Sequence, residues 1–365
     1  MANETRGPKA TGAGAPSPRP FFRLPALSGP VIGLVVVLAM FIALLWVHGG
    51  LGTFLSLGNA QVLVHDNTIA AVVALGMLLV MISGGIDLSV GSVVALVTVV
   101  TMWVFRFVYA GPAAVPQLHD GGWHWPGTHS VELASAAAVT AGVATGGLCG
   151  LFNGTMVTAL RLPSFVATLG LFSIARGLAF WLSERTPLSF PRGVRPGWVN
   201  ALAETSPPYG VFYPGFWSLV VLAVAVACLL RFTVLGRYCY AIGSNEATAR
   251  LCGVPIARSK LAIYTLAGLL TGWAGVLSFA HVGSGDPSGN VGLELIVIAA
   301  VVIGGASLNG GQGTVLGALI GVLILGILDN GVTAFNVPVE VKYILIGAII
   351  IANTALAQWQ RREGE

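Results

Sequence analysis

The stretch ISGGIDLSVGS, residues 82–92, stands between two apolar runs at 60–82 and 88–107. Each run is long enough to cross a hydrocarbon core of about 30 Å as an α-helix, which rises about 1.5 Å per residue. The glycine pair and the acidic side chain in the stretch interrupt what would otherwise be continuous apolar helix. The stretch therefore predicts two membrane-spanning helices joined by a glycine-containing break.

The composition of the whole chain agrees with this prediction. Of its 365 residues, 55% are hydrophobic and only 9% are charged, whereas soluble proteins have about 25% charged residues. The mean hydropathy of +0.85 and the 49 glycines are typical of closely packed membrane helices. The composition excludes a soluble enzyme, a disordered chain and a secreted disulfide scaffold.

Apolar runs long enough to span a membrane recur along the chain, and we expect ten spans. They lie at residues 30–47, 60–82, 88–107, 132–160, 163–183, 211–231, 260–281, 293–307, 314–329 and 341–358. The sequence thus predicts an all-α, polytopic integral membrane protein. Its membrane domain covers 30–358, between a disordered tail at 1–29 and a short tail at 359–365. We expect the first run to be a retained helix, because no small-residue cleavage site follows it.

The positions of Lys and Arg predict the orientation of the spans. The formal charge of +4 is spread over short segments between apolar runs, which reports topology rather than nucleic-acid binding. With the basic amino-terminal tail placed inside, the connection 232–259 and the tail at 359–365 also fall inside, and both are basic. The outer connection 108–131 has no Lys or Arg. The outer connection 184–210 has three arginines and runs against this orientation.

A second glycine-rich stretch, IGGASLNGG at residues 303–311, interrupts the later apolar runs. Glycine-interrupted segments in two halves of a chain indicate an internally repeated transporter with discontinuous helices around a path. A broken helix exposes backbone groups that lipid cannot satisfy, so such breaks must be buried in protein or line a wet cavity. The alternative is that both stretches are turns at the membrane surface.

Three charged residues, Asp87, Arg176 and Glu294, lie in or beside apolar runs. Each costs roughly 2.5–3.5 kcal/mol there and needs a partner or water. Asp87 either contributes to the path, or it or Ser89 simply caps the helix 88–107. Arg176 either extends to the membrane surface or pairs with Asp87 or Glu294.

The sequence shows no catalytic or metal-binding constellation. No GxxxxGK[ST] phosphate loop occurs, so an energy source other than ATP hydrolysis through that motif is expected. The cysteines show no metal-ligand spacing and are interpreted as packing residues, and the histidines are scattered. These are Cys149, Cys228, Cys239 and Cys252, and His48, His65, His119, His124, His129 and His281.

Within the inner connection, residues 245–250 predict a short helix. Ser244 or Asn245 is its expected N-cap, and Gly253 its stop. The helix is either the surface presented to a cytoplasmic partner or an ordinary surface helix of a long loop.

Four separated stretches resemble one family, the permease subunits of bacterial monosaccharide ABC importers of the ribose, xylose, arabinose and galactose type. The resemblance covers roughly residues 55–360. The stretches are GGIDLSVGS (84–92), LPSFVATLGLFSIARGLAF (162–180), LGRYCYAIGSNEATARLCGV (235–254) and VIGGASLNGGQGTVLGALIG (302–321).

The resemblance implies a multi-pass protein of the bacterial inner membrane with both termini in the cytoplasm. It implies that two permease copies pair, bind ATP-binding subunits inside, and receive a monosaccharide from a periplasmic binding protein outside. ATP and Mg would then belong to the partner subunit, with no cofactor or metal bound by this chain. The short inner helix would couple to the ATPase through Asn245, Glu246, Ala247, Arg250 and Gly253.

The expected path is alternately open to either side and needs no charge compensation, because a sugar is neutral. Polar side chains for brief contacts, an aromatic platform and the three intramembrane charges are the candidates, although Asn153 and Phe165 could equally serve packing. The candidate path residues are Asp87, Ser89, Asn153, Phe165, Thr168, Arg176 and Glu294, with Ser164 beside them. The outer loops 108–131 and 184–215 are longer than in the family, which leaves docking of a binding protein there open.

Other classes of transporter share parts of this pattern. An ABC permease for branched-chain amino acids or nucleosides has the same glycine-broken architecture, but a zwitterionic substrate predicts paired charges in the path. An ion-driven secondary transporter could use Asp87 or Glu294, but it has no need of the inner helix at 245–253. A membrane enzyme would need a cluster of acid, base or metal ligands, which the sequence lacks. The sequence does not specify the sugar.

Overall fold

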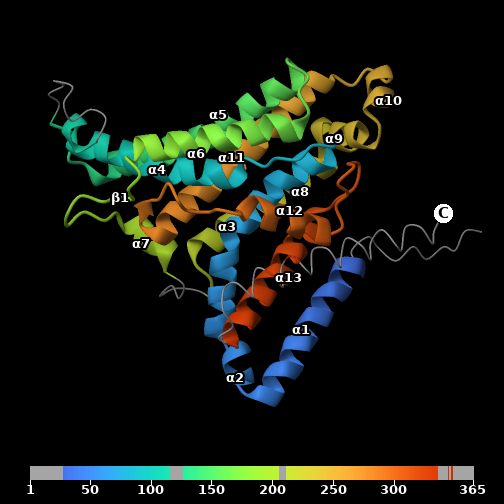
Figure 1. The fold of residues 1–365 in the computed structure, drawn as a ribbon, viewed down its shortest axis with the longest axis horizontal. Helices are drawn as coiled ribbons and strands as arrows, with labels where there is room; N and C mark the ends of the chain where they lie inside the picture. The colour runs from blue at the N-terminus through green and yellow to red at the C-terminus, as the bar shows by residue number, and fades with distance from the viewer. Residues whose placement is uncertain (1–27, 116–125, 205–210, 336–343, 345–346, 348–365) are drawn as a thin grey trace, which may run out of the picture.

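The structure is a computed structural model that describes residues 28–115, 126–204, 211–335, 344 and 347 (Figure 1). These residues are mostly helical and form only two strands of two residues each, which confirms the predicted all-α class. The helices are α1 (Ser28–His48), α2 (Leu51–Phe54), α3 (Leu57–Ile82), α4 (Val90–Ala110), α5 (Val131–Thr158), α6 (Ser164–Leu182), α7 (Gly197–Ala203), α8 (Pro214–Phe232), α9 (Val234–Ser244), α10 (Glu246–Leu251), α11 (Ile256–Val282), α12 (Leu293–Ile303) and α13 (Val315–Ala334). A 3₁₀ turn follows α4 at Pro112–Ala114, and β1 (Leu188–Ser189) pairs antiparallel with β2 (Ser284–Gly285).

Eight of the described helices are long and apolar enough to cross a membrane, and they coincide with eight of the ten expected spans. They are α1, α3, α4, α5, α6, α8, α11 and α13. The expected span at 293–307 is wrong in length: α12 has 11 residues, about 16 Å, and cannot cross a core of about 30 Å. The N-cap residue of α12, Gly292, has a φ of +83°, and the helix ends at the glycine pair Gly304 and Gly305.

Parts of three other expectations lie outside the described residues. These are the tenth span at 341–358, apart from residues 344 and 347, and the tails at 1–27 and 359–365. Segments 116–125 and 205–210 of the two outer loops lie outside them as well.

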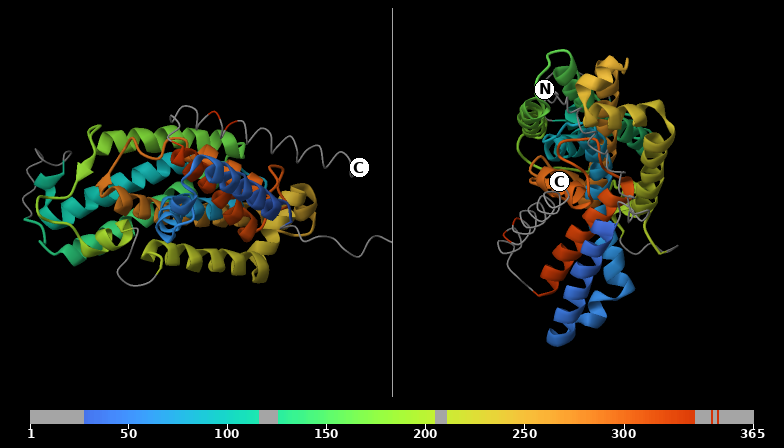
Figure 2. Two further views of the ribbon diagram at one scale, coloured as in Figure 1. Left: turned by 90° about the horizontal axis from the view of Figure 1, so that it is seen from below. Right: turned by 90° about the vertical axis from the view of Figure 1, so that its right-hand side faces the viewer.

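The centre of the molecule is α11, which packs against α3, α4 and α5. Figure 1 shows α4, α5, α6 and α11 running alongside one another, while α1, α3 and α13 slant away as a second group. Contacts of α3 with both α11 and α13 join the two groups. In Figure 2, α8 lies on the opposite side of the molecule from α6.

Glycines allow the closest of these contacts, between α5 and α11. Gly146 and Gly150 of α5 lie directly against the backbone of Gly268 and Gly272 of α11. A Cβ on Gly150 would overlap the carbonyl oxygen of Tyr264. Small residues let membrane helices approach until their backbones touch, and α5 and α11 are packed in this way.

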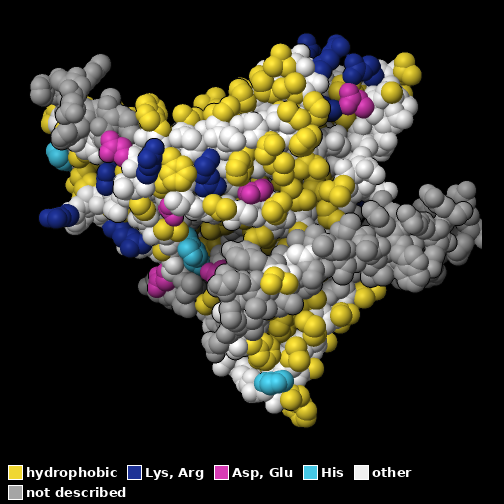
Figure 3. All heavy atoms as spheres, in the orientation of Figure 1, with side chains coloured by type: hydrophobic (Ala, Val, Ile, Leu, Met, Phe, Trp, Pro, Cys, Tyr) yellow, Lys and Arg dark blue, Asp and Glu magenta, His cyan; other side chains and the backbone are white. Residues whose placement is uncertain are grey.

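The face of the molecule drawn in Figure 3 separates into an apolar band and two charged ends. In Figure 3, Lys and Arg gather near α10 and, at the other end, toward β1, with hydrophobic side chains between them along α5 and α6. Phe165, Leu169 and Trp181 of α6 are among the exposed apolar side chains. A surface of this kind fits a bilayer around the middle of the molecule, with α10 and β1 in the two aqueous regions.

Candidate functional site

A buried chain of hydrogen bonds holds the first break to α5. The Oδ1 atom of Asp87 accepts from the backbone N–H of Ser89 at 2.8 Å and from its hydroxyl at 2.6 Å. The side-chain amide of Asn153, on α5, donates to the Ser89 hydroxyl oxygen at 3.0 Å. All three side chains are buried. Ser89 is the N-cap residue of α4, but neither its hydroxyl nor the Asp87 carboxylate bonds an amide inside that helix. Asp87 thus bonds the amide of the N-cap residue of α4, as one of its two interpretations expects, and Asn153 adds a link to α5 beyond capping.

The space beside this chain is very small. Asp87, Ser89 and Asn153 border a cavity of about 10 Å³. A cavity of roughly 10–15 Å³ holds about one water molecule, so this conformation leaves no room for a sugar there. The three residues tie α4 to α5 here, and their contribution to a path stays a prediction for another conformation.

Two hydroxyls of α6 satisfy backbone groups that the first break leaves free. The N–H of Ile86 donates to Ser164 Oγ at 3.2 Å, and the N–H of Leu88 donates to Thr168 Oγ1 at 3.1 Å. Lipid cannot bond the free N–H groups of a broken helix, and the two hydroxyls provide them with acceptors inside the protein. The sequence identified both hydroxyls but not this role for them.

Three other predicted path residues lie elsewhere. Phe165 is 51% exposed, so its side chain lies at the surface of the molecule and not in the interior. The Nη1 atom of Arg176 donates to the carbonyl oxygens of Pro287 and Gly289 at 2.8 and 2.9 Å. Glu294 is buried against α4, where a Cβ on Gly91 would overlap its Oε2 atom.

The structure therefore does not bring the intramembrane charges together as ion pairs. Among the described residues, no ion pair joins Arg176 to Asp87 or to Glu294. Arg176 lies within electrostatic range of Glu294, but carbonyl groups are its hydrogen-bonding partners. These hydrogen bonds hold the Arg176 guanidinium of α6 against the loop between β2 and α12.

The second break is held mainly by its own backbone. Ser307 donates its N–H to the carbonyl oxygen of Gln312 at 3.1 Å, and the N–H of Asn309 donates to Ser307 Oγ at 3.3 Å. Gly310 and Gly311 have φ values of +89° and +75°, a left-handed conformation that favours glycine. This break is a tight loop between α12 and α13.

Both breaks meet the carboxyl end of α9, and we call this contact the glycine junction, formed by Gly84, Gly243, Gly310 and Gly311. A Cβ on Gly310 would lie 2.9 Å from the Cα atoms of both Gly243 and Gly84. The N–H of Gly311 donates to the carbonyl oxygen of Ile82, the last residue of α3, at 2.9 Å. Three segments far apart in sequence thus touch backbone to backbone.

One side chain adds to this contact. The hydroxyl of Tyr240, on α9, donates to the carbonyl oxygen of Gly313 in the second break at 2.8 Å. Since α10 begins three residues after Gly243, the short helix is directly connected to both breaks. The sequence could not reveal the glycine junction, because each of its glycines has a local explanation.

The short inner helix forms as predicted. The Asn245 side chain caps α10 by accepting from the N–H of Thr248 at 2.9 Å, and Gly253, with a φ of +80°, follows its end. Glu246 binds Arg250 at 3.0 Å and Lys260 of α11 at 2.7 Å. The hydrogen bond from Lys260 is the main cause that lowers the pKa of Glu246 below its usual value, with Arg250 adding to it.

A cleft joins α10 to the first break. Its volume is about 500 Å³, within the range of small-molecule pockets of about 300–1,000 Å³. Its lining includes Ser83, Gly84 and Gly85 of the first break together with three charged residues, Glu246, Arg250 and Lys260. The cleft reaches the first break from the α10 end of the molecule.

Sequence reasoning missed one exposed apolar residue at the end of α10. Leu251 ends α10 and is 89% exposed, although α10 is otherwise mostly polar. An apolar side chain on a short polar helix was the available signal. Ala247, the other apolar candidate on this helix, lies in its first turn.

The family model described as "Branched-chain amino acid transport system / permease component" matches residues 61–354. An L-arabinose ABC transporter permease protein of Azospirillum brasilense is 35% identical over 312 residues, covering 85% of this chain and 83% of the relative. The ribose import permease protein of Escherichia coli K12 is 33% identical, covering 82% and 85%. The fructose import permease protein of Rhizobium meliloti is 32% identical, covering 91% and 85%. No solved structure matches.

The match spans both breaks, α10 and the membrane helices that hold them, which is the part of the molecule that forms the glycine junction. The chain is therefore a multi-pass membrane protein that belongs to this family of ABC-transporter permease components.

Proposed function

We propose that this chain is the membrane subunit of an ATP-driven importer that moves a monosaccharide into the cytoplasm. The relatives named for arabinose, ribose and fructose support a sugar as the substrate class. The observation that carries the mechanism is the glycine junction, because it connects α10 to both helix breaks.

In this proposal two copies of the chain pair, and each binds a separate ATP-binding subunit through α10. ATP and Mg²⁺ are held by that subunit, which also hydrolyses ATP. The exposed Leu251 is a suitable anchor for its surface, and a periplasmic binding protein delivers sugar at the opposite end of the molecule. Both termini and α10 then lie in the cytoplasm.

Alternating access follows from these contacts. When the ATP-binding subunits close, they move α10, and the end of α9 moves with it. Because Gly243 touches both breaks, a small displacement there shifts α3 and α4 relative to α12 and α13. The cleft of about 500 Å³ between the first break and α10 is the proposed exit toward the cytoplasm.

The substitution Tyr240→Phe tests this mechanism, because it removes one hydrogen bond from α9 to the second break with little change of shape. Purified transporter is reconstituted with its ATP-binding subunit and binding protein, and uptake of labelled arabinose, ribose and fructose is measured per ATP hydrolysed. A hydrogen bond contributes about 0.5–1.5 kcal/mol, so we expect a two- to tenfold lower ratio of sugar to ATP.

The control is Tyr238→Phe on the same helix, which should leave the ratio unchanged. Equal ratios in the two variants would contradict coupling through the glycine junction. Uptake that continues without any ATP-binding subunit would instead indicate an ion-driven carrier.

The family description favours one second candidate, a branched-chain amino acid. The same vesicles test it directly with labelled leucine in place of sugar. Leucine uptake without uptake of any monosaccharide would replace the sugar with an amino acid and leave the coupling mechanism to be judged separately.

A further inference from the structure

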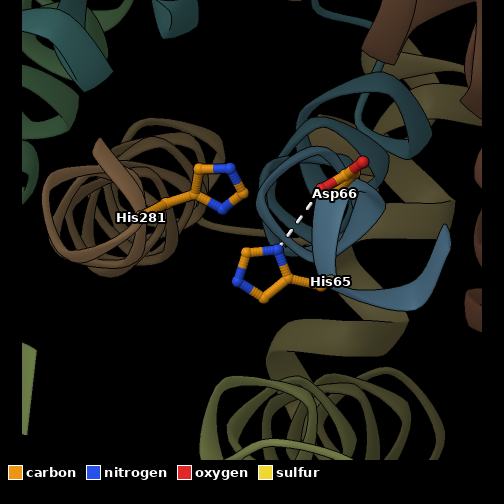
Figure 4. A group of neighbouring side chains, drawn as sticks. All are labelled: His65, Asp66 and His281. Atoms are coloured by element: carbon orange, nitrogen blue, oxygen red, sulfur yellow. Dashed lines mark hydrogen bonds and ion pairs between the residues drawn. The ribbon is translucent and has the colours of Figure 1, made fainter. Parts of the chain in front are cut away.

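A cluster of possible metal ligands lies far from α10. His65 on α3, its neighbour Asp66 and His281 at the end of α11 face one another (Figure 4), and their donor atoms all lie within 4.8 Å of one another. His281 is near the carboxyl end of the 27-residue α11, about 40 Å along the helix from the α10 end. We propose that these three side chains form a binding site for a divalent transition-metal ion, with Zn²⁺ as the best match.

The chemistry of the donors favours this class of ion. Two imidazoles and one carboxylate, with a fourth position open to water, are a ligand set that Zn²⁺ uses in proteins. Ligand bonds of about 2.0–2.2 Å at tetrahedral angles place neighbouring donor atoms roughly 3.3 Å apart. His65 Nδ1 and Asp66 Oδ1 already have this separation of 3.3 Å.

The third donor is close and free to adjust. The rings of His65 and His281 are stacked, with their centroids 4.2 Å apart. His281 is exposed at the end of its helix, so rotation of its side chain can bring a ring nitrogen to the same ion. The open side of the cluster also gives an ion in solution a way in.

Packing holds the His65 ring in place, although one of its two nitrogen atoms has no hydrogen-bond partner among the described residues. His65 is only 3% exposed, and the Tyr213 ring packs against it at a centroid distance of 4.6 Å. Its buried Nε2 atom has no hydrogen-bond partner among the described residues. In the proposed site the ion binds Nδ1, the nitrogen that faces Asp66, so Nε2 stays on the opposite edge of the ring and is not one of the ligands.

An ion at this site would join two helices with central positions in the fold. Helix α3 ends at the first break, and α11 follows α10 and packs against α3, α4 and α5. The ion would brace α3 against α11 at the end of the molecule remote from the glycine junction.

Direct binding tests the proposal. Full-length protein is purified through a tag without histidine, treated with a chelator and titrated with ZnCl₂ by calorimetry, with the metal content measured afterwards. We expect one ion per chain. His281→Asn and Asp66→Asn alter exposed ligands, so the fold should survive, and each should weaken binding at least tenfold.

Two controls address other histidines. His48→Asn alters an exposed histidine of α1, and a combined variant replaces His119, His124 and His129 of the outer loop by Asn. Both should bind as the unaltered protein does. Affinity lost in the loop variant but kept in His281→Asn would overturn the proposal, as would equal binding in all variants.

Thermal unfolding gives an independent readout. At a Zn²⁺ concentration about a hundred times Kd, binding should raise the melting temperature by about 3 °C. Without metal, His281→Asn should melt at the same temperature as the metal-free unaltered protein, and its rise with the same Zn²⁺ concentration should be at most about half as large, because its affinity is at least tenfold weaker. A rise of the same size in this variant would contradict the site.

Discussion

Glu246 forms the ion pair that links α10 to α11, beside the apolar packing of Ala249 against Ile242 and Ile256. Its two carboxylate oxygens bind Arg250 within α10 and Lys260 on α11, so one side chain orders the short helix and fastens it. The carboxylate is 41% exposed, and an ion pair open to water contributes only about 0.2–1 kcal/mol. These ion pairs are therefore weak enough to yield when a partner binds.

The lowered pKa of Glu246 predicts how this attachment depends on pH. A carboxylate with a lowered pKa in the folded state stabilises that state above its ordinary pKa of about 4.3, and the stabilisation disappears as pH falls through the lowered value. A spin label on the exposed Cys252, with the other cysteines replaced, should therefore become more mobile below about pH 4.

Glu246→Gln should make the label more mobile already at pH 7, by about two- to fivefold in the mobile fraction, and should remove the change at low pH. Glu132→Gln, at the start of α5, is the control and should keep the behaviour of the unaltered protein. A label that responds to pH equally in all three proteins would contradict this assignment.

At the scale of elements, the first break is stable because a neighbouring helix supplies its hydrogen bonds. Ser164 and Thr168 of α6 accept the N–H groups that α3 and α4 leave free, while the second break closes largely on its own backbone. The first break thus depends on the position of α6, and the second depends more on its glycines.

Thr168→Val should expose this dependence. The change keeps the shape of the side chain but leaves the Leu88 N–H without its partner, which costs about 1–3 kcal/mol in a buried place. Thermal unfolding in detergent should show a clearly lower melting temperature.

The matched control is Thr155→Val, because the Thr155 hydroxyl bonds the Leu151 carbonyl oxygen of its own helix at an exposed position. That change should stay within about 0.5 kcal/mol. Equal melting temperatures for the two variants would show that the α6 hydroxyl does not support the break.

At the scale of the whole molecule, we expect the α10 end and the β1 end to face different sides of the membrane. Six candidate spans, α1, α3, α4, α5, α6 and α8, lie between the amino terminus and α10. An even number of crossings would return the chain to the side on which it began, so we predict that α10 lies on the same side as the start of α1, which the basic residues predict to be the cytoplasm.

A membrane-impermeant maleimide can check this orientation at Cys252, which is exposed just after α10. It should label Cys252 in inside-out vesicles and not in intact spheroplasts. A variant with Cys252→Ser and Glu184→Cys, at the opposite end, should show the reverse pattern. Labelling of Cys252 from outside would reverse the topology and remove α10 from any cytoplasmic partner.

The sequence by itself determined the features that depend on neighbouring residues. Apolar length located eight helices that can cross the membrane, the glycine pairs located both breaks, and the Asn245 cap with Gly253 located α10. The length of the apolar run at 293–307 wrongly predicted a membrane span, because α12 ends at Ile303 and the rest of the run belongs to a glycine loop.

Only the tertiary structure decided which distant groups meet. It gave Arg176 two carbonyl oxygens instead of a carboxylate, turned Phe165 outward, and brought His65 together with His281. It also formed the glycine junction from three separate segments. The physical reason is that helix length, capping and glycine conformation are set by local bonding, whereas the partner of a buried charge, amide or imidazole depends on how the helices pack.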